Sequence, residues 1–198
     1  MIARWSALVL AGGAGRRFGG RKLLADLAGA PVIRRVADRI VGVGFAEVIA
    51  VTGAEDEAIK RALAGADVSI ILATDWAEGM AATLRTGIAA LDPHSEGVCI
   101  FLGDMPLVPA ALSPTLVTAA AQAGYAARPR CEGKPGHPVA FTRAAFGDLL
   151  ALEGDRGATV LLAARGEGVA YVETADSGVL LDIDTPEDLA AAVAAWKA

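Results

Sequence analysis

A glycine-rich, basic segment follows the first apolar run of the chain. Between Leu10 and Lys22 it holds five glycines and four cationic side chains. Glycine lets a backbone approach an anion and point successive N–H groups at it, while Arg and Lys neutralise negative charge. The segment is therefore predicted to bind phosphates. Two familiar phosphate-binding patterns are excluded, because a dinucleotide fingerprint would need glycine at Phe18 and a P-loop would need lysine at Arg21.

Three aspartates are candidates for binding a divalent cation. Asp104 follows the apolar run Val98–Leu102. A carboxylate at the end of a buried strand can hold Mg²⁺ against nucleotide phosphates, although an ordinary turn before Pro106 is the alternative. Asp182 and Asp184 alternate along an extended segment, so their side chains are expected to point the same way and could share one cation. Capping of the last helix is nearly as well supported for Asp184, and the sequence leaves open which of the two binds metal.

A few further residues lie where a ligand could reach them. Gly79 and Thr83 mark the start of a predicted helix, whose free N–H groups and hydroxyl could bind a nucleotide or its base. His137 could contact an acceptor substrate or could be a turn histidine. Arg156 could lie over a second phosphate-bearing substrate or pair with Asp155 in a structural turn.

Positioning these residues requires a layered α/β fold. Short β-branched runs alternate with Ala-rich segments of helical period, as in parallel strands joined by helices. Strands are predicted over Ala7–Ala11, Glu47–Thr52, Val68–Leu72, Val98–Leu102, Tyr125–Arg128, Pro138–Phe141, Val169–Glu173 and Val179–Leu181. Helices are predicted over Val32–Val43, Asp56–Leu63, Met80–Ala90, Ser113–Ala123, Arg143–Leu150, Ala158–Arg165 and Pro186–Trp196, the last capped by Thr185. Ligands bind such sheets at the carboxyl ends of the strands.

The composition favours one globular domain over residues 1–198. Hydrophobic residues make up 54% and charged residues 21% of the chain, which excludes disorder as the main state. A net charge of −5 argues against a nucleic-acid partner, because nucleic acids are held largely through neutralised phosphates. No apolar run approaches the ~20 residues that span a bilayer, and no secretion signal is visible. Cys99 and Cys131 form no disulfide framework, so a reducing cytoplasm is expected.

Motifs along nearly the whole chain resemble one known family. The glycine-rich segment, with Arg17, Gly19 and Lys22, resembles the signature loop of the MobA-like nucleotidyltransferases. The branch of this family that contains molybdenum cofactor cytidylyltransferases is similar in further motifs: Gly79-Met80, Thr83-Leu84-Arg85, Leu102-Gly103-Asp104-Met105-Pro106, Gly136-His137-Pro138-Val139, Gly154-Asp155-Arg156-Gly157-Ala158 and Leu181-Asp182-Ile183-Asp184-Thr185-Pro186-Glu187-Asp188.

The resemblance implies a three-layer α/β sandwich of GT-A type with a mostly parallel sheet. It also implies an enzyme that uses Mg²⁺ or Mn²⁺ to move a nucleoside monophosphate from an NTP to the terminal phosphate of molybdenum cofactor. A molybdoenzyme or its chaperone could be a protein partner, and neither nucleic acid nor a membrane is expected. The implied catalytic residues are Arg17, Lys22 and Asp104. The implied nucleotide-binding residues are Leu10, Ala11, Gly12, Gly13, Ala14, Gly15, Arg17, Lys22, Gly79, Thr83 and Gly103. The implied metal-binding residues are Asp104, Asp182 and Asp184, and the implied acceptor-binding residues are His137 and Arg156.

Several alternatives stay open. Cytidylyltransferases of the family typically have alanine where this chain has Gly12, and Leu-Ala-Gly-Gly resembles the guanylyl branch, so the sequence favours CTP over GTP without deciding between them. Relatives act on sugar phosphates or methylerythritol phosphate. A GT-A glycosyltransferase would also be α/β and metal-dependent, and Asp182-Ile183-Asp184 is a DxD, but such motifs usually lie mid-chain. A non-catalytic nucleotide-binding module is the remaining alternative.

Overall fold

The structure is a computed structural model that describes residues 2–13, 15–155 and 157–196. Its strands are β1 Ser6–Ala11, β2 Asp26–Leu27, β3 Ala30–Pro31, β4 Glu47–Thr52, β5 Ser69–Leu72, β6 Gly97–Leu102, β7 Ala126–Cys131, β8 Lys134–Pro135, β9 Val139–Thr142 and β10 Val169–Glu173. Its α-helices are α1 Val32–Val41, α2 Asp56–Ala62, α3 Met80–Ala89, α4 Ser113–Ala123, α5 Phe146–Leu150, α6 Thr159–Arg165 and α7 Pro186–Ala195. Short 3-10 helices include Lys22–Leu24, Trp76–Glu78 and Ser177–Leu180.

The main sheet has the strand order β10-β7-β9-β6-β1-β4-β5, with β8 paired to β7 at one side. The pairs β1·β4, β1·β6, β4·β5 and β7·β10 are parallel, and β9 runs antiparallel to both of its neighbours. The carboxyl ends of β1, β4, β6 and β7 therefore lie at one edge of the sheet, where a ligand crevice is expected.

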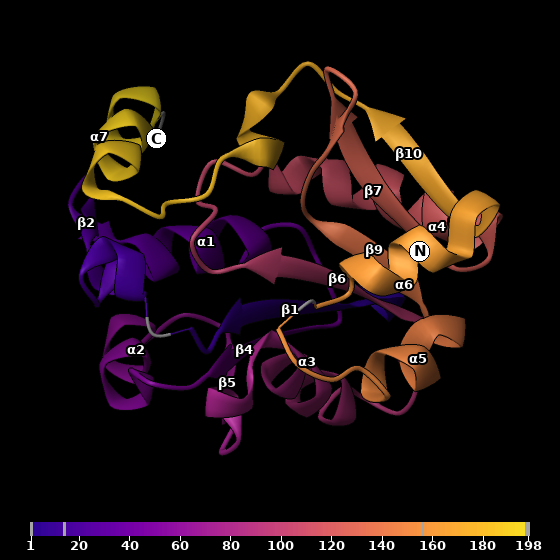
Figure 1. The fold of residues 1–198 in the computed structure, drawn as a ribbon, viewed down its shortest axis with the longest axis horizontal. Coiled ribbons are helices and arrows are strands. Elements are labelled where there is room, and N and C mark those ends of the chain that lie inside the picture. Colours follow the sequence, from indigo (N-terminus) through magenta and orange to yellow (C-terminus); the bar gives the residue numbers. More distant parts are fainter. Residues whose placement is uncertain (1, 14, 156, 197–198) are drawn as a thin grey trace.

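Helices cover both faces of this sheet, because side chains alternate between the faces along each strand (Figure 1). On β1, Ala7 and Val9 belong to the core cluster that includes residues of α1, α2 and α4. Leu8 belongs to the cluster on the opposite face, with residues of α3, α5 and α6. The fold is a three-layer α/β sandwich of GT-A type, as the sequence predicted.

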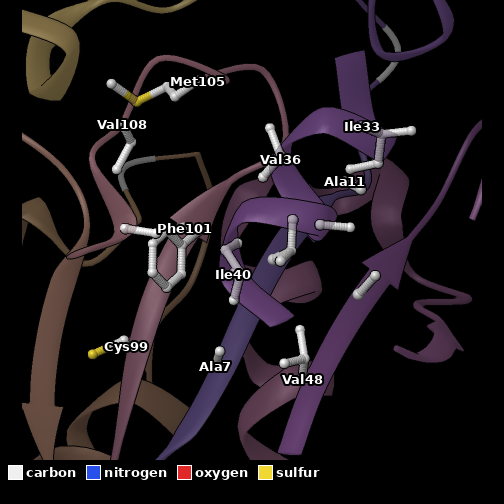
Figure 2. Close-up of a cluster of buried hydrophobic side chains, with 14 of the residues drawn as sticks. Ala7, Ala11, Ile33, Val36, Ile40, Val48, Cys99, Phe101, Met105 and Val108 are labelled. Carbon is white, nitrogen blue, oxygen red and sulfur yellow. The ribbon is translucent and has the colours of Figure 1, made fainter. Parts of the chain in front are cut away.

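Helix α1 shows how the sequence determines one of these layers. Its residues Ile33, Val36 and Ile40 follow the spacing of one helix face, and all three are buried. Figure 2 shows them in one cluster with Ala11 of β1, Val48 of β4 and Phe101 of β6. Truncating one of these buried side chains to alanine would lower the free energy of unfolding by about 2–5 kcal/mol.

Most predicted elements are confirmed, but the prediction of a strand over Val179–Leu181 is wrong. That segment falls largely within the 3-10 helix Ser177–Leu180, where the Asp176 carboxylate accepts a hydrogen bond from Gly178 N at 2.8 Å. The apolar run reflects burial of Val179 instead of sheet pairing. The β2–β3 hairpin and β8 were not predicted, because each strand has only two residues. In the described part of the chain, no helix is long and apolar enough to cross a membrane.

The last helix begins as predicted, with Thr185 as its N-cap and a capping box. Thr185 Oγ1 accepts a hydrogen bond from Asp188 N at 3.2 Å, and Asp188 Oδ2 accepts one from Thr185 N at 2.7 Å. The same Asp188 oxygen accepts a hydrogen bond from Asp184 N at 3.1 Å. In Figure 1 the chain after β10 runs back across the molecule to α7, which contacts β2. The cap thus fixes the backbone of Asp184 without using its side chain.

Candidate active site

A cavity of about 520 Å³ lies at the carboxyl ends of β1 and β6, where the glycine-rich segment and Asp104 meet. The predicted site residues that line it are Leu10, Ala11, Gly12, Gly13, Gly15, Arg17, Lys22, Gly79, Thr83, Asp104 and Asp184. Gly103, Asp182 and His137 are not in its lining. Ala14 and Arg156 lie outside the described residues, so the structure does not locate them.

The glycine-rich segment turns tightly so that Lys22 comes back to the cavity. The Gly15 carbonyl accepts hydrogen bonds from Phe18 N at 3.1 Å and from Gly20 N at 3.0 Å. Gly15 has a φ of 57°, in the left-handed region that favours glycine. A Cβ there would lie 3.2 Å from Lys22 Cγ, so a larger residue would push against the lysine side chain. Glycine at this position therefore permits both the turn and the placement of Lys22.

Lys22 bridges two carboxylates in the cavity. Its Nζ lies 2.5 Å from Asp104 Oδ2 and 2.9 Å from Asp184 Oδ1. The side chains of Lys22 and Asp104 are only 14% and 20% exposed, so water screens this pair weakly. Burial by itself would lower the pKa of Lys22, but the charges and hydrogen bonds of Asp104 and Asp184 outweigh it and the pKa is raised. Lys22 is consequently a firmly protonated ammonium group at neutral pH.

Backbone hydrogen bonds bring the two carboxylates together from distant parts of the chain. Gly103 N donates to Leu10 O at 3.0 Å, which joins the loop after β6 to the end of β1. Ile183 N donates to Asp104 O at 2.9 Å and so places the segment before α7 beside that loop. Its neighbour Asp184 then faces Lys22, whose hydrogen bond is the main cause of the lowered pKa of Asp184.

Arg17 lies at the rim of the same cavity. Its Nη1 is 3.0 Å from Asp184 Oδ2, and its side chain is 84% exposed. An ion pair this exposed contributes little to stability, because water and salt screen it. Arg17 is accordingly free to exchange its carboxylate partner for a ligand phosphate.

The donor set fits a divalent cation that is completed by substrate oxygens. No three His, Cys, Asp or Glu side chains gather as a metal cluster within the described ranges. Mg²⁺ commonly binds one or two carboxylates together with substrate phosphates and water, and Asp104 and Asp184 supply two carboxylates beside Lys22. Asp182 makes no such contact with Lys22 within the described structure, and partial desolvation of its carboxylate, followed by the charges of both other aspartates, raises its pKa. The geometry therefore favours Asp184 over Asp182 as the second ligand.

The start of α3 forms the opposite wall of the cavity. A Cβ on Gly12 would lie 2.4 Å from Thr83 Oγ1, so the glycine-rich segment and α3 touch closely at this point. Gly79 has a φ of 119°, and a Cβ there would lie 2.4 Å from Asp155 Oδ1. Arg85 of the same helix turns away, since its Nη1 donates to Leu152 O at 2.7 Å. Arg85 is thus a structural residue.

The lining also includes residues outside the predicted site, among them Trp76 and Asp155, the latter expected only as a structural partner of Arg156. Trp76 belongs to the 3-10 helix that follows β5, and Asp155 approaches from the loop before α6. Trp76 lies shortly after the carboxyl end of a parallel strand, so the rule that identified Asp104 would also have identified it. Asp155 carried no comparable signal, because its contact with Gly79 joins segments far apart in the sequence.

His137 lies apart from this cavity, in the lining of a second one. Burial, and next the positive charge of Arg128, lower the pKa of His137 to about 4, against the opposing effect of a hydrogen bond with the Ile100 backbone. Its Nδ1 atom is buried and has no hydrogen-bond partner among the described residues. His137 is therefore neutral at pH 7.

A sequence model of the MobA-like NTP transferase domain matches residues 7–171. The chain belongs to the MobA-like NTP transferase family. The likeness of its fold to solved structures agrees with this assignment. A homologue of Mycobacterium tuberculosis Rv0371c from Mycobacterium sp. strain JC1 is 27% identical, with a TM-score of 0.84 over 99% of this chain and 100% of that chain. Rv0371c of M. tuberculosis H37Rv in complex with manganese is 26% identical, with a TM-score of 0.77 over 96% and 98% of the two chains.

Two curated relatives differ in how much of them this chain matches. Nicotine blue oxidoreductase of Paenarthrobacter nicotinovorans is 27% identical over 93% of this chain and 94% of that protein. The bifunctional protein GlmU of Rhizorhabdus wittichii is 35% identical over 54% of this chain, which corresponds to 24% of GlmU. The chain thus spans about a quarter of the length of GlmU.

Proposed function

We propose that this protein transfers a nucleoside monophosphate from an NTP to the terminal phosphate of molybdenum cofactor and releases pyrophosphate, with CTP as the preferred donor. The observation that carries the proposal is the position of Lys22 Nζ, 2.5 Å from Asp104 and 2.9 Å from Asp184 beside a glycine-rich segment. This arrangement offers cationic donors to phosphates and carboxylates to a metal. The sequence motifs shared with the cytidylyl branch support the choice of acceptor and of CTP.

The proposed reaction joins two phosphates. An oxygen of the acceptor phosphate attacks the α-phosphorus of the NTP in line with the bond to the β-phosphate, and that bond breaks as pyrophosphate leaves. Because the acceptor phosphate is already ionised at pH 7, the step requires no general base. Catalysis then consists of positioning the two phosphates and neutralising the charge that builds up on the leaving group.

Each group of the site has a definite task in this scheme. The backbone N–H groups of Gly12 and Gly13 face the phosphates, and Lys22 and Arg17 neutralise their charge. Asp104 and Asp184 would hold a divalent cation, which would supply positive charge to the phosphates. Once a nucleotide binds, the phosphates compete with both carboxylates for the Lys22 ammonium. Lys22 therefore has to change partners during each catalytic cycle.

The choice between CTP and GTP depends on the wall where Gly12 meets Thr83. With no Cβ on Gly12, the Thr83 hydroxyl can approach the glycine-rich segment closely, since an added Cβ would lie 2.4 Å from it. The motifs from Gly79 to Arg85 and from Gly136 to Val139 favour the cytidylyl branch. Glycine at position 12 favours the guanylyl branch, so GTP remains the second candidate donor.

The test is pyrophosphate release with each of CTP, GTP, ATP and UTP, with Mg²⁺ or Mn²⁺ and molybdenum cofactor as acceptor. We expect CTP to give the highest kcat/KM, and Asp104→Asn to lower it by about 100-fold or more with little change in Tm. Lys22→Met should lower kcat similarly, whereas Lys60→Met, a surface lysine paired with Asp56 on α2, should not. Equal rates for Lys22→Met and wild type would refute the proposed role of Lys22.

Product analysis separates the alternatives. Release of a nucleoside diphosphate from a nucleotide sugar would indicate a GT-A glycosyltransferase, and NTP binding without turnover on any phosphate acceptor would indicate a binding module. Pyrophosphate release with a sugar phosphate or methylerythritol phosphate would retain the transferase but change its acceptor. Because one relative bears the name of an oxidoreductase, consumption of NAD(P)H should be measured on the same samples.

A further inference from the structure

A second cavity of about 150 Å³ adjoins the proposed nucleotide site. The two cavities share Leu10, Met80, Leu102 and Asp155 in their linings. Most of the second lining is apolar and includes Leu84, Ile100, Val139, Phe141 and Leu162. An apolar cavity of this volume can hold a single six-membered ring. Two of its lining residues, Arg128 and His137, are polar groups whose hydrogen-bonding capacity is not satisfied by the protein.

Arg128 is a buried cation that forms no ion pair within the described residues. Its side chain extends from β7, and the residue is only 9% exposed. Its Nε and Nη2 both donate to the Gly136 carbonyl, at 3.1 and 3.0 Å. Across the described ranges it forms no other hydrogen bond and no ion pair. A guanidinium has five N–H donors, and an unpaired buried charge is energetically costly, so the remaining N–H groups call for an anion.

His137 lies close enough to Arg128 to respond to its charge. That charge, together with burial, keeps the His137 ring neutral at pH 7. The neutral ring donates its one N–H to the Ile100 backbone, so Nδ1 is left as a hydrogen-bond acceptor without a partner within the described residues. It can accept from the hydroxyl of a singly protonated phosphate, or donate to an anion once the ring is protonated. The pair thus carries one net positive charge, in a lining whose other ionisable side chain is Asp155.

We infer that Arg128 and His137 form an anion-binding subsite for the acceptor, and that the preferred acceptor carries a phosphate or carboxylate next to a ring-sized apolar portion. This inference rests on the proposed function, because the acceptor is defined by its reaction with the NTP bound in the adjoining cavity. Arg128 neutralises the anion, the apolar walls receive the ring, and the shared lining residues allow the acceptor to extend toward the α-phosphorus.

Phenyl phosphate and benzoate are suitable probes, with phenol as the uncharged control. The chain contains only two histidines, His94 and His137, so the imidazole nitrogen resonances of wild-type protein can be followed individually by NMR. Either anionic probe should shift the His137 resonances and raise its pKa, since it would neutralise the neighbouring guanidinium. The resonances of His94, an exposed residue of the loop before β6, should not move. The spectrum of a His94→Gln variant shows which resonances belong to His94 and which to His137.

Calorimetry with the same probes then tests Arg128 directly. Arg128→Met should raise the Kd of phenyl phosphate about ten- to a hundredfold. Arg128→Lys, which keeps the charge, should recover part of the affinity. Arg4→Met removes the same charge at an exposed pair with Glu96 near the opposite edge of the sheet and should leave the Kd unchanged. Whichever of phenyl phosphate and benzoate binds more tightly shows whether the subsite prefers a phosphate or a carboxylate.

The outcomes distinguish this inference from the proposed function. Titration with CTP and Mg²⁺ on the same samples tests the nucleotide site, and Arg128→Met should bind CTP as the wild type does. If CTP binds but phenyl phosphate neither shifts His137 nor depends on Arg128, the acceptor subsite is refuted while the nucleotide site stands. Binding of phenol as tight as that of phenyl phosphate would likewise refute an anion site. Failure to bind any NTP would instead refute the proposed function.

Discussion

Lys22 occupies the position between Asp104 and Asp184 that a divalent cation would take. Its ammonium group lies 2.5 and 2.9 Å from one oxygen of each carboxylate, so a metal that binds these same two oxygens has to displace it. Binding of Mn²⁺ without nucleotide must therefore displace a buried ion pair. With nucleotide present, the phosphates offer Lys22 another partner. Metal and nucleotide should consequently bind with positive cooperativity.

The size of this effect follows from the burial of the pair. At an effective dielectric constant of about 20, two unit charges about 4 Å apart attract by roughly 4 kcal/mol, and desolvation offsets part of that. A net cost of about 1–3 kcal/mol for displacing Lys22 corresponds to a factor of about 5–150 in affinity. Lys22→Met keeps the length of the side chain and removes its charge. We expect it to bind Mn²⁺ tighter than the wild type by that factor when nucleotide is absent.

The assay is a titration of free Mn²⁺ by electron paramagnetic resonance, with and without a non-hydrolysable CTP analogue. The analogue should strengthen Mn²⁺ binding to the wild type far more than to Lys22→Met. Lys60→Met controls for the change in net charge, and Asp104→Asn in the Lys22→Met background should abolish the tight binding. Equal Mn²⁺ affinities for wild type and Lys22→Met would refute competition between lysine and metal.

Three further outcomes are expected. Gly12→Ala should weaken NTP binding measured by calorimetry, because the new Cβ would lie 2.4 Å from Thr83 Oγ1. Adding Thr83→Ala should restore the NTP affinity. His137 has a pKa of about 4 in the folded protein, against 6.5 for an unfolded histidine, so the unfolded state binds more protons between these two pH values. The free energy of unfolding should therefore fall as the pH drops through this window, by at most about 1.4 kcal/mol per pH unit. His137→Gln should flatten that slope in urea unfolding, and His94→Gln should not. Thr185→Ala removes the cap of α7 and should lower the free energy of unfolding by about 0.5–2 kcal/mol while weakening Mn²⁺ binding.

Each of these outcomes has a result that would contradict it. For Gly12, the close approach to Thr83 is unimportant if the single and double variants bind NTP equally. For His137, if the free energy of unfolding of His137→Gln still falls between pH 6.5 and 5 as in the wild type, the pH dependence comes from other groups. For Thr185, loss of stability without any change in Mn²⁺ affinity would mean that the cap does not help to position Asp184.

The glycine-rich segment and Asp104 could be found from the sequence, because both depend on local signals. An apolar run predicts a buried strand, and the polar residues directly after it must lie at the edge of the sheet. The last helix was predictable for the same reason, since Thr185 and Pro186 specify its start within two positions. These signals need no knowledge of the tertiary structure.

Other features depend on contacts between distant segments and could not be predicted in this way. Arg128 is one residue in a short strand, and only the packed structure reveals that it forms no ion pair within the described residues. The choice between Asp182 and Asp184 required the hydrogen bond from Ile183 N to Asp104 O. Val179 was assigned to a strand because burial and β-branching alone do not distinguish sheet pairing from loop packing.

The hydrogen bond from Ile183 N to Asp104 O has a consequence for how the site is completed during synthesis. The family match ends at residue 171, and all strands of the main sheet precede residue 174, yet Asp184 comes after both. A chain emerging from the ribosome can therefore pair its whole sheet and form the glycine-rich loop while Lys22 still has only Asp104 as a partner. The second carboxylate is synthesised after the whole sheet, so a nascent chain brings both carboxylates to Lys22 only once the segment before α7 has emerged.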